Sequence, residues 1–256
     1  VAVFDAVSGV EPQSETVWRQ ADRYNVPRIC FINKMDRVGA DFEKCISMLI
    51  ERLGAKPIRL QLPIGVEDRF HGVVDLVKMQ AVFWDTDKMG ENPRIDDIPE
   101  ELALEAEQYR EALLDAAANF DDSLMERVLE GGVIEEAQLI AAIRTGTISQ
   151  EITPILCGTA FKNKGVQTLL DAVIDYLPNP EELPPVQGEH PETGARLERL
   201  PSDEEPFSAL AFKIMTDPFV GQLTFFRVYS GMLRSGDSIV NVAKGKKERI
   251  GRILQM

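Results

Sequence analysis

Two short loops in this 256-residue chain carry side chains that are suited to reading a guanine base. The first loop is residues 33–36, Asn-Lys-Met-Asp, and the second is residues 159–161, Thr-Ala-Phe; each follows an apolar run typical of a buried strand. The carboxylate of Asp36 can accept hydrogen bonds from guanine N1–H and N2–H₂ together, a pair of donors that adenine lacks. We therefore expect Asp36 to select guanine.

The other residues of these loops have complementary roles in this interpretation. The aliphatic stem of Lys34 lies along one face of the base, and Asn33 ties the two loops together. In the second loop, the backbone N–H of Ala160 reaches the guanine carbonyl oxygen, and Thr159 and Phe161 flank it. An ordinary Asx turn after a strand would also explain the first loop, but it leaves the second loop unexplained.

The residues that would bind and cleave a triphosphate are not found in the sequence. A GTPase needs a G-x-x-x-x-G-K-[ST] loop, whose amides and Lys hold the phosphates and whose hydroxyl holds Mg²⁺. The Gly245-Lys246 pair has Val240 in place of the first glycine and Lys247 in place of the hydroxyl. We expect a base pocket here and assign no catalytic residue and no metal ligand.

Several stretches of the chain resemble the elongation factor G family of translational GTPases: residues 4–18, 31–37, 160–167, 212–221 and 223–231. Members of that family usually carry Ser where Thr159 stands, and the substitution keeps a small hydroxyl at this position. The resemblance implies a GTP- and GDP-binding enzyme that drives tRNA and mRNA through the bacterial ribosome, with ribosome recycling as a further role. Its implied partners are ribosomal RNA and the ribosomal stalk proteins.

The resemblance also implies that the chain is an internal segment of a longer protein. The chain opens on the apolar residues 1–4 without a Met and stops within the strand-like residues 252–256. In the family, the preceding part carries the phosphate loop and both switches, and the following part completes a barrel and adds further domains. We therefore expect Mg²⁺ in the intact parent only, and we expect the isolated segment to hydrolyse no GTP.

Composition fits a cytoplasmic, monomeric protein that does not enter membranes. No apolar run approaches the roughly 18 residues of a membrane span, and no signal-peptide pattern is found. Cys30, Cys45 and Cys157 show no metal-binding spacing, so we interpret them as small hydrophobic residues in a reducing compartment.

The order of predicted elements indicates an α/β fold class, namely a partial P-loop-type G domain with a parallel sheet and helices on both faces, an α+β insertion, and part of an antiparallel β-barrel. The expected segments are 1–62 for the first part of the G domain, 63–150 for the insertion, 151–178 for the second part of the G domain, 179–206 for a linker, and 207–256 for the first half of barrel domain II.

Four local expectations depend on periodicity and capping patterns. A helix over residues 12–25 is expected to carry Val17, Ala21 and Tyr24 near its one apolar face, and residues 57–62 are expected to form one strand. Ser123 is expected to cap a short helix, and Leu170 is expected to face the core from the helix at 166–177.

Charge is unevenly distributed along the chain. The net charge is −14, but residues 207–256 carry eight Lys and Arg against three Asp and Glu, a net charge of +5, which leaves −19 for residues 1–206. The candidate RNA contacts in this basic segment are Lys244, Lys246, Lys247, Arg249 and Arg252. A solvated hairpin tip would show the same composition, and the family resemblance favours contact with ribosomal RNA phosphates.

Two other functions remain open at this point. A related ribosome-protection GTPase would use the same base pocket and would differ in its distal domains. A non-catalytic guanine-nucleotide-binding module would keep the pocket and lack a phosphate loop in the full gene.

Overall fold

A computed structural model describes residues 1–84, 90, 93–190, 193–219 and 221–254. The chain divides into two compact units, Val1–Pro178 and Asn179–Met256. A parallel sheet with helices occupies the first unit and antiparallel strand pairs occupy the second, so the predicted fold class is confirmed.

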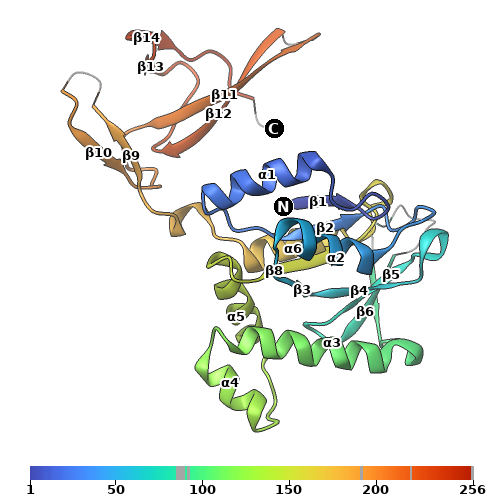
Figure 1. The fold of residues 1–256 in the computed structure, drawn as a ribbon. Helices are drawn as coiled ribbons and strands as arrows, with labels where there is room; N and C mark the ends of the chain where they lie inside the picture. Colours follow the sequence, from blue (N-terminus) through green and yellow to red (C-terminus); the bar gives the residue numbers. More distant parts are fainter. Residues whose placement is uncertain (85–89, 91–92, 191–192, 220, 255–256) are drawn as a thin grey trace. The chain divides into compact units, whose positions relative to one another are not determined.

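A four-stranded parallel sheet forms the centre of the first unit (Figure 1). Its order is β1 (Ala2–Asp5), β2 (Cys30–Asn33), β8 (Thr153–Cys157) and β3 (Pro57–Arg59). The helices α1 (Pro12–Arg23) and α2 (Phe42–Leu53) pack on one face, and α6 (Val166–Tyr176) packs on the other. A strand buried on both faces must be apolar throughout, which explains the runs that precede both base loops.

Side chains alternate between two hydrophobic cores along β2. Phe31 points into the core that contains the α6 side of the sheet, whereas Cys30 and Ile32 point into the core on the α1 and α2 side. This alternation follows from the two-residue period of a strand, and it anchors the strand from both faces. The residues that follow Ile32 therefore leave the sheet at a fixed position.

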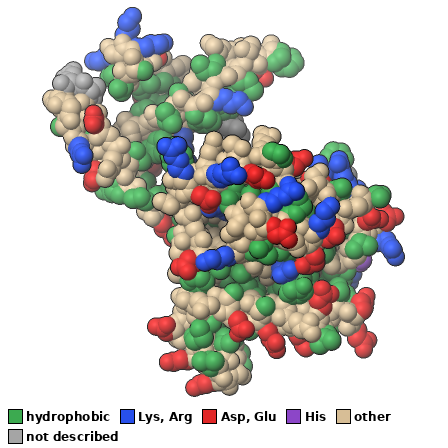
Figure 2. All heavy atoms as spheres, in the orientation of Figure 1, with side chains coloured by type: hydrophobic (Ala, Val, Ile, Leu, Met, Phe, Trp, Pro, Cys, Tyr) green, Lys and Arg blue, Asp and Glu red, His purple; other side chains and the backbone are tan. Residues whose placement is uncertain are grey.

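The segment between β3 and β8, called the insertion below, contains an antiparallel sheet and three helices. The strands are β4 (Gln61–Ile64), β5 (Gly72–Asp75), β6 (Gln80–Trp84) and β7 (Pro93–Asp96), paired in that order, with a 3-10 turn η1 (Glu67–Arg69) between the first two. The helices are α3 (Glu100–Ala118), α4 (Asp122–Leu129) and α5 (Glu136–Ile148). Acidic side chains are gathered along the α3 and α4 part of this unit (Figure 2).

The single strand expected over residues 57–62 is wrong, because the chain changes sheets at Leu60. Its N–H donates to Ile155 O of the parallel sheet at 3.0 Å, while its carbonyl accepts from Leu76 N of the insertion at 2.9 Å. Leu60 is buried in the core that the two sheets share. An apolar run alone cannot show such a change of partner.

Three of the other local expectations were also wrong. The buried residue of α1 is Trp18, whose ring packs against Phe4 and lies beneath the Arg28 guanidinium. Because the helix turns this large apolar side chain toward the core, Val17 and Tyr24 are left exposed. The cap of α4 is Asp121, which accepts from Leu124 N at 2.9 Å; Ser123 donates to Asp121 instead.

Leu170 is exposed on α6, because Leu169 and Val173 already fill the groove above the sheet. None of the helices in the described residues is long and apolar enough to cross a membrane.

The second unit consists of three antiparallel pairs. The expected linker contains the 3-10 turn η4 (Pro180–Glu182) and a hairpin of β9 (Val186–Glu189) and β10 (Arg196–Arg199). It is followed by β11 (Ser208–Asp217) with β12 (Gly221–Ser230), and by β13 (Ser238–Asn241) with β14 (Lys246–Arg249). The last strand ends earlier than expected, and the expected strand end at 255–256 lies outside the described residues.

Candidate guanine-binding site

Both base loops leave the parallel sheet at the same edge. β2 and β8 are neighbouring parallel strands, and the loops follow their carboxyl ends. Backbone hydrogen bonds hold the two exits together, because Gly158 N donates to Ile32 O at 2.9 Å and Met35 N donates to Gly158 O at 3.2 Å. The carboxyl edge of a parallel sheet is where α/β folds bind ligands, so the two loops lie where a ligand is expected.

Asn33 joins the two loops with a single side-chain oxygen. Its Oδ1 accepts from Lys34 N at 2.8 Å and from Ala160 N at 2.9 Å. Lys34 has a φ of 65°, a left-handed conformation that non-glycine residues rarely adopt. The Ala160 N–H, which is expected to reach the base carbonyl, donates to Asn33 in this structure, and its contact with a base stays a prediction.

Asp36 is held on both oxygens. Oδ1 accepts from the Thr159 hydroxyl at 3.1 Å, and Oδ2 lies 2.6 Å from Lys162 Nζ. The Asp36 side chain is only 16% exposed, and its burial raises the pKa; the hydrogen bonds from Lys162 and Thr159 outweigh burial and hold the pKa below its usual value. Asp36 is therefore an ionised acceptor at neutral pH, as a guanine reader must be.

Lys34 is oriented by an acid on the neighbouring strand. Its Nζ lies 2.6 Å from Asp5 Oδ2, and the other oxygen of Asp5 accepts from Val7 N at 2.9 Å. Burial raises the pKa of Asp5, but the hydrogen bonds from Lys34 and from two backbone amides lower it by more than burial raises it. The pKa of Asp5 therefore lies below its usual value. Fixing the ammonium at Asp5 fixes the stem of Lys34 across the site.

The second loop has one buried and one exposed side chain. Thr159 is buried and holds Asp36, whereas Phe161 is 96% exposed. Gly158 is required behind the loop, since a Cβ there would lie 2.4 Å from Lys164 O and 2.7 Å from the Phe31 ring. The loop thus exposes the Phe161 side chain and packs its back against the core.

Lys164 fastens the second loop to the insertion. It is only 5% exposed, pairs with Thr159 through two backbone hydrogen bonds of 2.9 and 3.1 Å, and donates from Nζ to Phe70 O at 3.0 Å. Its pKa is lowered by burial and by the nearby Lys162. This lysine connects the base loop to the residue that follows η1, between β4 and β5.

Sequence reasoning missed three residues of this site. Asp5, Lys162 and Lys164 contact the predicted residues or their loop. Asp5 could have been found, because it ends the strand adjacent to Asn33 and lies in register with it. Lys162 is two residues from Ala160, but spacing alone does not show that its ammonium turns toward Asp36.

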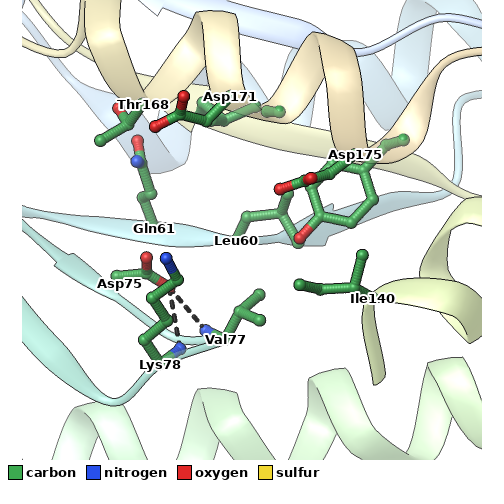
Figure 3. A pocket seen from close by; sticks show the side chains of 12 residues that line it. Leu60, Gln61, Asp75, Val77, Lys78, Ile140, Thr168, Asp171 and Asp175 are labelled. Carbon is green, nitrogen blue, oxygen red and sulfur yellow. Dashed lines mark hydrogen bonds between the residues drawn. The ribbon is translucent and has the colours of Figure 1, made fainter. Parts of the chain in front are cut away.

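A separate hollow of about 80 Å³ lies between the insertion and α6 (Figure 3). Asp75 and Lys78 line one side, and Asp171 and Asp175 line the other. Burial raises the pKa of Asp75 and of Asp175, although Asp75 accepts from Lys78 N at 3.0 Å. No residue of the two base loops lines this hollow, and no group of His, Cys, Asp or Glu in the described part of the chain is arranged to hold a metal ion.

The candidate RNA contacts lie in the second unit. Lys244 in the turn between β13 and β14, and Lys246 and Lys247 at the start of β14, are all exposed, and Figure 2 shows a cluster of basic side chains at this hairpin. Lys244 lies 3.8 Å from Glu248, and Arg249 donates to Gly236 O at 3.3 Å. Lys246 and Lys247 are consecutive on β14 and so lie on opposite faces of the hairpin, Arg249 ends that strand on the same face as Lys247, and Arg252 follows it.

Comparisons with known proteins agree with this geometry. Residues 1–179 match the elongation factor Tu GTP binding domain, and residues 206–256 match elongation factor G domain 2. A crystal structure of a protein from Thermus thermophilus aligns with 98% of this chain, with a TM-score of 0.74 and 25% sequence identity. The chain spans about a third of that protein, 34% of its length. The chain belongs to the translational GTPases that carry an elongation factor Tu GTP-binding domain, and it resembles elongation factor G within them.

Proposed function

We propose that this chain is the base-reading part of an elongation factor G, a GTPase that drives tRNA and mRNA through the ribosome. The observation that carries the proposal is the joining of two loops at the carboxyl edge of the sheet: Asn33 holds Ala160, and Thr159 holds the guanine-reading carboxylate of Asp36. The bound nucleotide is GTP or GDP.

The charge and geometry of Asp36 favour guanine over adenine. An ionised carboxylate has about four lone-pair sites, of which Thr159 and Lys162 use two. Guanine N1–H and N2–H₂ can occupy the remaining sites, whereas adenine offers an acceptor at N1. Lys34, held by Asp5, places its apolar stem beside the base, and Phe161 supplies an uncovered ring at the mouth.

The ribosomal part of the proposal is supported by the second unit. Its match to elongation factor G domain 2 and its exposed lysine turn favour contact with ribosomal RNA. The stalk proteins, a cytoplasmic monomeric state and a role in recycling are parts of the same proposal. Residues 1–256 contain no phosphate-loop motif, so hydrolysis and Mg²⁺ binding are assigned to no residue of this chain.

The test of base reading is Asp36→Asn in an intact protein that carries this chain together with a phosphate loop. Xanthine has a carbonyl where guanine has its N2 amine, and an asparagine amide can donate to it. We expect XTP to displace labelled nucleotide from the variant far better than GTP does. Asp41→Asn, which removes a nearby charge from a helix cap, keeps guanine preference. Unchanged GTP preference in Asp36→Asn would contradict the assignment.

Translocation is tested separately from base reading. The intact protein, supplied with GTP, should move peptidyl-tRNA on ribosomes into a puromycin-reactive state. A protein that selects guanine but does not advance the tRNA would point to a ribosome-protection factor or to a binding module.

A further inference from the structure

A second hollow, of about 490 Å³, lies between the start of α2 with the loop before it, the turn after β4, and α3. This volume is in the range of pockets that hold small organic molecules. Its apolar lining residues are Met35, Ala40, Phe42, Leu62, Pro63 and Val66. Met35, Phe42 and Leu62 are buried, whereas Val66 is 54% exposed, so a packed apolar floor reaches solvent here. Of the two base loops, Met35 alone takes part in the lining.

The rim of this hollow is acidic. Among the described residues that line it are four carboxylates and no Lys, Arg or His; the acids are Asp41, Glu43, Glu67 and Glu105. Glu105 is exposed and makes no hydrogen bond or ion pair with a described residue. Charges of one sign beside an apolar surface strengthen the local field and concentrate cations there. We call this site the acidic groove.

Two sets of side-chain contacts hold the walls of the acidic groove. Glu67 Oε1 accepts from Gly39 N at 2.7 Å, which joins the turn after β4 to the loop before α2. Arg59 Nε donates to Glu43 Oε1 at 3.0 Å, and the Arg59 guanidinium lies 4.5 Å from the centre of the Tyr109 ring on α3. The groove is therefore present before a ligand arrives, and a ligand need not order these segments when it binds.

The spread of the carboxylates decides which cation fits. A metal ion needs several oxygens within about 2.6 Å of one point, and no group of His, Cys, Asp or Glu among the described residues is placed to hold one. A single amine would pair with one carboxylate and leave the others without a counter-charge. A linear polyamine carries several ammonium groups joined by short methylene runs, so it can reach separate carboxylates and cover the apolar surface between them.

We propose that the acidic groove binds a linear aliphatic polyamine, whose ammonium groups pair with the carboxylates of the rim while its methylene chain lies on the apolar floor. Glu105 supplies a carboxylate that is free among the described residues, and Glu67 keeps lone pairs beyond the one that Gly39 uses. A bound polyamine links α3 to the turn after β4. The proposal does not depend on the proposed function, because it uses none of the side chains that read the base.

The test is calorimetric titration of spermine, a linear polyamine, into the intact protein that carries this chain, at low salt. The double variant Glu67→Gln with Glu105→Gln removes two charges from the rim, and the glutamine oxygen can still accept from Gly39 N. We expect it to bind spermine about ten-fold more weakly, since each exposed ion pair contributes up to a few-fold. Glu105→Gln alone, which breaks no contact with a described residue, should show about a three-fold loss.

The matched control is Glu107→Gln with Glu111→Gln on the same helix. Both residues are exposed, neither lines the groove, and the same net charge is removed. Spermine affinity should stay within about two-fold of the wild-type value, because distant exposed charges are screened.

The contribution of the apolar floor is measured with a second probe. Hexaamminecobalt(III) is a compact, highly charged cation without methylene groups, and we expect it to bind more weakly than spermine does. Val66→Ser removes apolar lining at an exposed position and should weaken spermine and leave the cobalt complex unchanged. Spermine should also slow backbone hydrogen exchange in residues 35–43 and 62–67.

Three outcomes would overturn the proposal. An equal loss of spermine affinity in the two double variants would mean that the polyamine responds only to the overall acidity of the chain. A cobalt complex that binds as tightly as spermine would mean that the groove only collects counter-ions. A short basic peptide that binds far more tightly than spermine, and competes with it, would assign the groove to a protein segment instead.

Discussion

The two units of this chain differ in how their side chains are held. In the first unit, Phe31 is 1% exposed and the strands behind the base loops are buried on both faces. In the second unit, Ser230 and Gly231 are the only buried residues among those described, and Phe212 is 61% exposed. Polar groups of the first unit are therefore fixed by a core behind them, whereas the lysines of the second project from a hairpin.

This difference separates two kinds of recognition. Reading a base edge requires donors and acceptors placed to within a few tenths of an ångström, and Asp36 and Asn33 have that support. Contact with a phosphate backbone depends mainly on the number of nearby charges, so an exposed turn is sufficient.

The largest expected difference is in stability. Phe31→Ala removes a fully buried ring and should lower the free energy of unfolding of the first unit by about 3–5 kcal/mol. Phe212→Ala is the matched change on β11 and should cost less than about 1 kcal/mol, because little apolar area is lost. Hydrogen exchange of β2 and β11 amides in urea would measure each unit separately. Equal losses would show that the second unit has a core of its own.

Much of this fold was predictable because its signals are local. Apolar runs such as 29–32 and turn residues such as Gly54, which ends α2 with a φ of 62°, indicate elements without knowledge of their neighbours. The change of sheet at Leu60 and the burial of Trp18 are tertiary choices. They depend on which distant part of the chain each apolar side chain packs against, and the spacing of apolar residues along the sequence does not contain that information.

The site divides in the same way. The types of Asn33 and Asp36, with their positions after strands, predict a base pocket, and the structure brings them together with Thr159 and Ala160. The structure adds Lys162 to Asp36, a pairing that depends on the direction of a long side chain. It also shows that the Ala160 N–H, expected to reach the base carbonyl, donates to Asn33 Oδ1.

The next largest effect is expected from Asn33→Ala. Loss of its Oδ1 leaves the amides of Lys34 and Ala160 without their acceptor and frees the two loops from each other. Guanine-nucleotide affinity of the intact protein should fall by about 1–3 kcal/mol, roughly 5- to 150-fold. Asn119→Ala, at the exposed end of α3, should leave the dissociation constant of GDP unchanged. Equal GDP affinity in both variants would mean that the hydrogen bonds of Asn33 to the two loops do not contribute to nucleotide binding.

A smaller effect is expected from pH. The pKa of Asp36 is lowered in the folded chain, so its ionisation stabilises the fold above the ordinary pKa of 3.8, and this stabilisation is lost as the pH falls through the lowered value. Lys162→Met should therefore cost up to about 1 kcal/mol at pH 6; this cost should begin to shrink as the pH falls below 3.8, and it should disappear below the lowered pKa, where Asp36 of the folded chain is protonated.

The matched variant for this pH dependence is Lys244→Met in the second unit. Lys244 and Glu248 are both exposed and lie 3.8 Å apart, so their pairing should contribute little at any pH. Urea unfolding of both variants from pH 3 to pH 7 would measure the two costs. A pH-independent cost for Lys162→Met would show that its contribution is packing rather than charge.

The smallest effect per residue is expected at the lysine turn, and it concerns salt dependence. Residues 207–256 carry a net charge of +5, whereas the other residues carry −19, a charge that is already sufficient for solubility. Contact with RNA phosphates therefore explains the basic segment better than solubility does. Each phosphate contact contributes somewhat less than one unit to the slope of log affinity against log salt. The double substitution Lys246→Gln with Lys247→Gln should therefore lower that slope by roughly one to two units.

The slope is measured from ribosome binding by the intact protein across a salt series, and Lys44→Gln with Lys56→Gln in the first unit is the matched double substitution. GDP affinity should stay constant, because the turn and Asp36 belong to different units. Equal slopes in all three proteins would leave these lysines as solvated charges at a hairpin tip.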